Sequence, residues 1–177
     1  MRAIIDYLFG FLFSKPDLIK MFTREGSQPT LEQVRAAIKR GAPVKARAPD
    51  TRTVLMLAAV RTQDPEVILE LIRAGAKPNE RRYGVNGYID TDSDSPPTHS
   101  SPTTALMMAA ESNPNPEILN ALLEGGADPR IGNADDWTAF SFISRNAKLK
   151  GTAVYEILRK AHENRKPADF ICSSVAI

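Results

Sequence analysis

The chain has 177 residues, of which 42% are hydrophobic and 25% are charged. This length and composition are typical of one water-soluble domain. Its 23 basic and 21 acidic residues leave a net charge of +2, so no global positive field favours nucleic-acid binding. Because Cys172 is the one cysteine, no intramolecular disulfide can form, which fits a reducing compartment such as the cytoplasm.

Residues 1–13 are unusually apolar. One face of a helix would carry Ile4, Ile5, Leu8, Phe11 and Leu12. We expect a helix that caps the open end of the helical array predicted below. A signal or membrane-surface segment and a partner-binding helix are the alternatives. Arg2 alone supplies positive charge, no small-residue cleavage site follows, and the segment is far shorter than the ~20 residues that span a bilayer.

A short helix over Asp17–Thr23 is predicted after Pro16. Thr30 and Gln33 then have the spacing of a capping box, in which each side chain satisfies a backbone donor of the other. They predict a second helix that ends before Gly41.

Two longer stretches, Thr53–Gly75 and Thr104–Gly126, share one pattern. Each opens with a threonine able to cap a helix, continues through two adjacent alanines, restarts at a Pro-Glu pair and stops at a glycine. Thr138 follows Thr104 by 34 positions, and Gly75 follows Gly41 by the same 34. A repeated step of paired helices, interrupted once, predicts a repeat array.

The interruption, residues 80–103, has the composition of a loop. Its greater length costs about 1 kcal/mol of chain entropy, which a fold tolerates. Three of its aspartates alternate as at the start of a calcium-binding loop, namely Asp90, Asp92 and Asp94. Ser95 stands where that motif needs glycine, and Ser101 where it needs glutamate. We therefore interpret the segment as a solvated loop.

The threonine, the double alanine, the Pro-Glu helix start and the Gly-Ala-Asp-Pro ending together resemble the ankyrin repeat, in variants seen in bacterial proteins. The resemblance is most specific over 53–79 and 104–130, looser over 30–47 and weakest over 138–161. There Phe140, Ser141 and Phe142 replace part of the usual core, so the last unit is either a regular repeat or a terminal cap.

This resemblance implies an all-α ankyrin-repeat solenoid of stacked helix–turn–helix units with β-turn fingers. The whole chain, 1–177, would form one domain. Its parts would be an N-terminal cap (1–29), repeats (30–79 and 104–130), an inserted loop (80–103) and a C-terminal cap unit with a tail (131–177).

The resemblance also implies a protein-interaction module, such as an inhibitor, immunity or adaptor protein of bacterial type, that binds a partner protein with its concave face and fingers. The corresponding contact positions are Asp50, Arg52, Val60, Arg61, Ser101, Thr103, Glu111, Ser112, Asp135, Trp137, Arg145 and Asn146. The inserted finger would extend this surface through Arg81, Arg82, Tyr83 and Tyr88. Trp137 either anchors the partner or packs over the neighbouring loop.

Neither histidine, His99 or His162, has a sequence neighbour typical of a metal site or a catalytic triad, and no phosphate-binding loop is present. We therefore expect no enzyme activity, cofactor or metal, and no nucleic-acid, small-molecule or membrane partner. The alternative is an enzyme or enzyme accessory whose site lies in the 80–103 insertion and uses Tyr83, Tyr88, the aspartates and His99.

Overall fold

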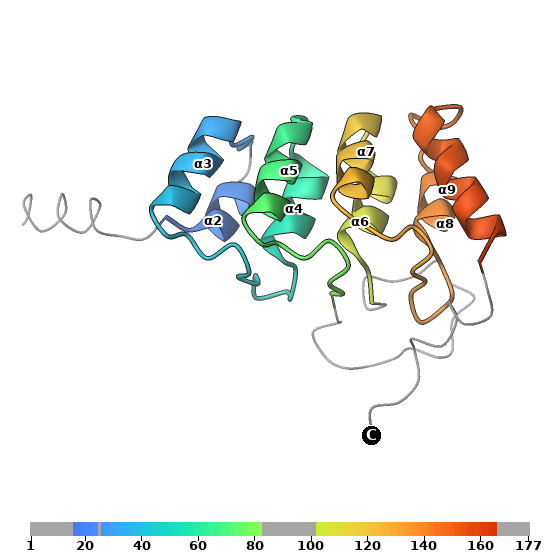
Figure 1. Ribbon diagram of the computed structural model, residues 1–177, viewed down its shortest axis with the longest axis horizontal. Coiled ribbons are helices and arrows are strands. Elements are labelled where there is room, and N and C mark those ends of the chain that lie inside the picture. The colour runs from blue at the N-terminus through green and yellow to red at the C-terminus, as the bar shows by residue number, and fades with distance from the viewer. Residues whose placement is uncertain (1–15, 25, 83–101, 166–177) are drawn as a thin grey trace, which may run out of the picture.

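The computed structural model describes residues 16–24, 26–82 and 102–165. Within these ranges the regular structure consists of eight helices, with two isolated β-bridges and no strand (Figure 1). The all-α prediction is confirmed. The expected helix in residues 1–13 and the tail after Arg165 lie outside the described residues, as does most of the insertion.

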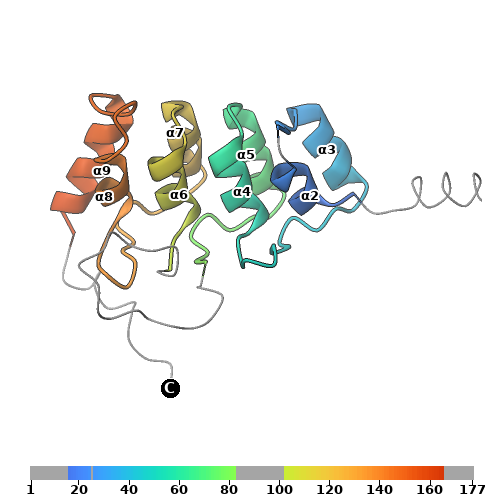
Figure 2. The same cartoon turned by 180° about the vertical axis from the view of Figure 1, so that it is seen from behind.

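The helices form four consecutive pairs. They are α2 (Leu18–Thr23), α3 (Leu31–Lys39), α4 (Val54–Arg61), α5 (Pro65–Arg73), α6 (Ala105–Ser112), α7 (Pro116–Glu124), α8 (Ala139–Ile143) and α9 (Ala153–Glu163). In both views the pairs lie side by side in chain order (Figures 1 and 2). The first helices pack in one row, α2 on α4, α4 on α6 and α6 on α8, and the second helices pack in another from α3 to α9. This two-layer stack is a solenoid.

The predicted capping signals start the helices. The Gln33 amide donates to the Thr30 hydroxyl at 3.4 Å, and the Thr30 amide donates to Gln33 Oε1 at 3.1 Å, which is the capping box expected at α3. Thr53 and Thr104 cap α4 and α6 by accepting the backbone N–H three residues on. Asn115 caps α7 ahead of a proline in its first turn.

Glycines follow three of the four second helices, α3, α5 and α7, at the expected positions. Gly75 has a φ of 98° and Gly126 a φ of 91°, both in the left-handed region that a Cβ disfavours. Gly41, after α3, has a φ of 83°, so the first unit ends in the same way.

The core runs along the stack between the two rows. The adjacent alanines of α4 and α6, Ala58, Ala59, Ala109 and Ala110, are all fully buried. Small side chains at these positions let successive first helices approach closely. Leucine and isoleucine side chains of the second helices complete the core, and the largest include Ile68, Leu71, Ile118, Leu119 and Leu122. Each unit therefore buries its apolar surface against its neighbours rather than within itself.

The last unit stacks on the third, with α8 against α6 and α9 against α7. It nevertheless differs from the units before it. The Thr138 hydroxyl lies 3.0 Å from Nδ1 of His162 on α9. Phe140 makes an edge contact with Tyr155 at 5.5 Å between ring centroids and a tilted contact with His162 at 5.4 Å. Aromatic rings thus join the two helices of this unit.

None of the helices in the described ranges is long and apolar enough to cross a membrane. Those ranges also hold no cluster of three or more side chains that could bind a metal ion.

Candidate protein-interaction face

The loops before α4 and α8 leave the stack on the same side, and the described ends of the loop before α6, residues 80–82 and 102–103, lie on that side too (Figures 1 and 2). We call them the first finger (residues 47–53), the middle finger (80–103) and the third finger (133–137). In the first, the Ala48 amide donates to Arg52 O at 2.8 Å. In the third, the Asn133 amide donates to Trp137 O at 2.9 Å. The two fingers therefore have the same paired base, with three residues at each tip.

The base of the middle finger repeats this pairing. The Arg82 amide donates to Thr103 O at 2.8 Å, and the Thr103 amide donates to Arg82 O at 3.2 Å. Arg82 and Thr103 stand in the positions that Ala48 and Arg52 occupy in the first finger. The inserted residues consequently begin after Arg82 and end before Thr103, at the tip of a finger, and the helices on either side keep the regular stacking.

Arg47 ties the first finger to the middle one. Its Nη1 donates to Thr51 O at 2.8 Å in its own finger and to Arg81 O at 3.3 Å in the next. Its Nη2 lies 3.6 Å from a carboxylate oxygen of Glu80. One guanidinium thus fixes the spacing of two fingers, because its planar set of donors can serve several acceptors at once.

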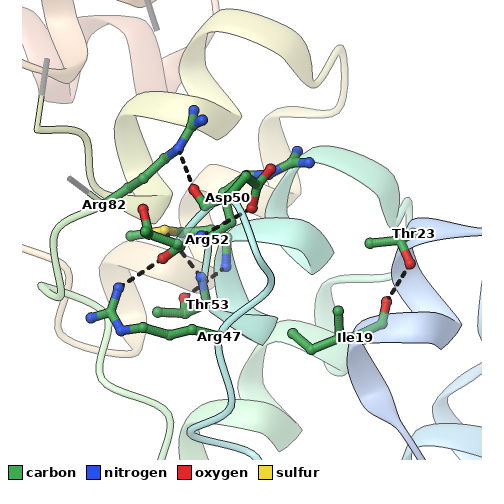
Figure 3. Close-up of polar contacts among 9 residues, drawn as sticks. Ile19, Thr23, Arg47, Asp50, Arg52, Thr53 and Arg82 are labelled. Carbon is green, nitrogen blue, oxygen red and sulfur yellow. Dashed lines mark hydrogen bonds and ion pairs between the residues drawn. The ribbon is translucent and has the colours of Figure 1, made fainter. Parts of the chain in front are cut away.

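Arg82 makes a second tie in the opposite direction (Figure 3). Its Nε donates to the backbone oxygen of Asp50 at 3.1 Å, while the Asp50 carboxylate forms an ion pair with Arg52. Three of the residues predicted to contact a partner therefore also shape the fingers. Their side chains are partly buried and enter the face in fixed positions.

The third finger is held from the end of α9. Arg165 Nη2 lies 2.6 Å from Oδ1 of Asp136, and only 3% of the Arg165 side chain is exposed. Ahead of this finger, the hydrogen bond from Arg130 holds the pKa of Asp128 below its ordinary value of 3.8. The charged groups around this finger are thus largely paired.

The remaining predicted positions lie at the other end of the first helices. Arg61, Glu111 and Ser112 are exposed at the C-terminal ends of α4 and α6, and Val60 beside them is half-buried. A helix of this length spans about 12 Å, which separates these side chains from the finger bases. The predicted site is therefore two groups of side chains, the finger group and the helix-end group, along one row of helices.

Trp137 and Arg145 bring the two groups together in the last unit. The Arg145 guanidinium carbon lies 4.2 Å from the Trp137 ring centroid, a cation–π contact. Trp137 also packs against Phe142, with 5.9 Å between ring centroids, and is half-buried. The α8 helix has only five residues, so a side chain that follows it can reach back to the finger.

Asn146 was predicted to contact a partner protein, but its side chain instead forms hydrogen bonds inside the stack. Its amide donates to Ala110 O and Asn113 O, both at 3.1 Å. One unit earlier, Asn113 donates in the same way to Ala59 O at 2.8 Å and Thr62 O at 2.9 Å. These two asparagines link the C-terminal ends of successive first helices.

Some of the predicted contact residues are not placed. Tyr83, Tyr88 and Ser101 lie outside the described residues, as do Asp90, Asp92, Asp94 and His99 of the alternative enzyme site. Asp135 is exposed on the third finger, and Arg81 is half-buried at the base of the middle one.

Sequence reasoning missed three residues that organise the face: Arg47, Asn113 and Arg165. Asn113 could have been found, because it precedes Asn146 by 33 positions and so recurs at one place in the repeat. Nothing local marks Arg47 as a link to the middle finger or Arg165 as a link to the third, since Arg81, Glu80 and Asp136 lie on other segments of the chain.

The helices stack in pairs, glycines follow α3, α5 and α7, and the fingers leave the stack on one side. These features define a helical-repeat protein. The family model for the ankyrin repeat matches residues 50–83 and 103–134, two stretches that meet the insertion at either end. The chain therefore belongs to the ankyrin repeat family. A search of curated proteins found no match. Ankyrin repeats are generally protein–protein interaction modules, and the family is typically not enzymatic.

Proposed function

We propose that the protein binds one specific partner protein through its fingers and the exposed ends of its first helices. The observation that carries this proposal is a set of ties between backbone segments. Arg47 and Arg82 join the first finger to the base of the middle finger, and Arg165 joins the third finger to the end of α9. A surface held rigid before binding loses little conformational entropy when a partner docks.

The chemistry of the face also suits a protein partner. It offers a half-buried tryptophan covered by an arginine, and these two residue types often dominate interface energetics. Arginines gather around the first two fingers and α4, namely Arg47, Arg52, Arg61, Arg81 and Arg82. Among the described residues, Glu80 pairs with Arg47 and Asp50 pairs with Arg52. The excess of positive charge in this described part of the face favours an acidic patch on the partner.

Within this proposal, the protein acts by occupying its partner's surface, as an inhibitor, immunity or adaptor protein of bacterial type in the cytoplasm. It needs no cofactor and carries out no reaction. The ankyrin repeats support the binding part of this role, because they are generally protein–protein interaction modules.

The test begins with affinity purification of the tagged chain from its native cells and identification of the bound protein. Binding of the purified pair is then measured for the double variant Arg61→Ala with Glu111→Ala, and for Arg145→Ala. Lys39→Ala on α3 and Arg73→Ala on α5 are matched controls on the second helices. We expect about tenfold weaker binding or more for the face variants, a loss of about 1.4 kcal/mol, and unchanged binding for the controls.

Circular dichroism must show that every variant is folded. The proposal is wrong if the two controls weaken binding while the face variants bind normally. Failure to recover any partner that binds the purified chain directly would also contradict it.

A further inference from the structure

Arg145 is held in the candidate face by an aromatic ring rather than by an acid. Its guanidinium carbon lies 4.2 Å from the centroid of the Trp137 ring, and the side chain is exposed. By contrast, Arg52 on the first finger is paired with Asp50. Among the residues that the structure describes, no carboxylate forms an ion pair with Arg145. Its positive charge is therefore not neutralised within this part of the chain.

The two acids on the third finger are already engaged elsewhere. Oδ1 of Asp136 lies 2.6 Å from Nη2 of Arg165, whose side chain is only 3% exposed. Moving this carboxylate away would leave a buried cation without its acid, which is costly. Oδ2 of Asp135 accepts a hydrogen bond from the Asn133 amide group at 3.5 Å. The finger thus supplies no counter-ion to Arg145.

Both members of the Trp137–Arg145 pair are fixed before a partner binds. The Trp137 backbone amide donates to Asn133 Oδ1 at 2.8 Å, and the indole ring packs against Phe142. The Arg145 backbone amide donates to Phe142 O at 3.1 Å. The next residue, Asn146, is hydrogen-bonded to α6 through its side chain. A group held in this way loses little entropy when a ligand binds to it.

A guanidinium that lies on an aromatic ring is well suited to bind a carboxylate. The ring covers one face of the planar group, whereas the N–H donors point outward along its edge. Two of these donors match the spacing of the two oxygens of a carboxylate. Because Arg145 is exposed, an acidic group of another protein can reach this edge.

The loop between α8 and α9, residues 144–152, adds positive charge next to Arg145. It contains Lys148 and Lys150 and no acid. Both lysines are exposed, while Leu149 between them is fully buried and anchors the loop. The corresponding loops between α4 and α5 and between α6 and α7 are much shorter. The positive charge of this loop favours an anionic group at the end of α8.

We propose that Arg145, stacked on Trp137, binds the carboxylate of an aspartate or glutamate side chain of the partner protein. This inference rests on the proposed function and adds the chemical group that the partner places at the last unit. The chain has a net charge of only +2, too small for the broad cationic field on which nucleic-acid binding depends. A protein carboxylate is therefore favoured over a phosphate backbone.

The first test compares two arginines of the face in binding to the purified partner. Arg145→Lys keeps the charge but loses the planar donors and most of the stacking, so we expect about tenfold weaker binding or more. Arg61→Lys is the matched control, because Arg61 is exposed on the same face and lies on no ring among the described residues. It should change binding by less than about twofold.

Equal binding by the parent and by folded Arg145→Lys would overturn the proposal. If the double variant Arg61→Ala with Glu111→Ala still weakens binding in that case, the proposed function stands and this inference alone fails.

The second test identifies the acid on the partner. Each aspartate or glutamate of the partner is replaced in turn by its amide, and binding is measured to the parent chain and to Arg145→Ala. We expect one replacement to weaken binding to the parent by about tenfold while leaving binding to Arg145→Ala nearly unchanged, because the pair is already broken there.

Replacements that weaken binding to both chains by the same factor would overturn the proposal. It would also be overturned if no amide replacement had an effect and dephosphorylation of the partner abolished binding, since the site would then hold a phosphate group.

A third measurement observes the site directly. Trp137 is the only tryptophan, so incorporation of fluorotryptophan gives this chain a single fluorine NMR resonance. The unlabelled partner should shift this resonance, and the partner variant that lacks the identified acid should shift it less. A resonance that stays in place when the chain is saturated with partner would overturn the proposal.

Discussion

At the scale of single residues, Asn113 shows how one side chain can join two repeat units. It is fully buried after α6, and its amide reaches two carbonyls at the end of α4. Its own oxygen accepts the Asn115 amide at 2.9 Å, which shapes the turn into α7. A buried polar group of this kind is costly to remove, because its partners stay behind without a donor.

We therefore predict that Asn113→Ala lowers the free energy of unfolding by about 2 kcal/mol, measured by urea denaturation. Asn120→Ala is the matched control, since the Asn120 amide makes only a 3.4 Å contact with Glu117 within α7. It should change stability by no more than about 0.5 kcal/mol. Equal losses for the two variants would mean that the inter-unit hydrogen bonds contribute little.

A second prediction concerns Asp128, whose pKa is lowered by its hydrogen bond with Arg130. A carboxylate of this kind stabilises the folded state above its ordinary pKa and loses that contribution as the pH falls through the lowered value. Asp128→Asn should therefore cost stability at pH 7, by less than about 1 kcal/mol because the pair is partly exposed. The parent and the variant should become equally stable at strongly acidic pH.

Thermal unfolding of both chains at several pH values would measure this convergence. Glu124→Gln, at an exposed carboxylate on α7, provides a nearby control. A gap between parent and Asp128→Asn that stays constant from pH 7 to the acidic limit would contradict the proposed role of the carboxylate.

At the scale of elements, the two glycines that end α7 are needed for different reasons. Gly126 has a φ of 91° and open space around it, so only its backbone conformation disfavours a side chain. Gly125 has an ordinary helical φ, but a Cβ there would collide with Cδ1 of Ile72 on α5. The sequence suggested a helix stop at this pair, whereas the close approach of α5 became evident only in the structure.

We predict that Gly125→Ala and Gly126→Ala each cost about 1 kcal/mol or more in the free energy of unfolding. Ile72→Val removes the colliding methyl group, so it should recover part of the loss from Gly125→Ala. The same substitution should add its own cost to that of Gly126→Ala, because Gly126 does not touch Ile72. Denaturant unfolding of the two double-mutant cycles makes the comparison, and identical coupling energies would contradict this distinction.

The helices were largely predictable because their signals are local. Thr30 with Gln33, the threonines before α4 and α6, and the glycines after α5 and α7 all act within a few residues of the chain. The short length of α8, five residues, was not predicted. The stacking of Arg145 on Trp137 depends on that length and could not be anticipated.

At the scale of the whole molecule, the insertion leaves the repeat array intact because it enters at a finger tip. We predict that replacing residues 83–102 by Pro-Asp-Thr, the tip of the first finger, preserves the helical content. The melting temperature should stay the same or rise slightly, because a shorter loop costs less entropy to close. Circular dichroism with thermal unfolding measures both, and loss of cooperative unfolding would show that the insertion is needed for the fold.

The interaction face was only partly predictable from the sequence. Matching positions to the ankyrin pattern indicated which residues belong to fingers and to helix ends. It could not show that Arg47 and Arg82 tie neighbouring fingers together, or that Asn146 is used inside the stack. These are contacts between single side chains and distant backbone atoms, which leave no periodic signal.

Hydrogen exchange of the chain, alone and bound to its purified partner, tests the proposed face most directly. We predict slower exchange in the complex at backbone amides of the first and third fingers, residues 47–53 and 133–137. Amides on α5 and α7, in the row of second helices, should exchange at unchanged rates. Protection confined to α5 and α7, with the fingers unaffected, would contradict the proposal that this protein binds its partner through the finger side of the stack.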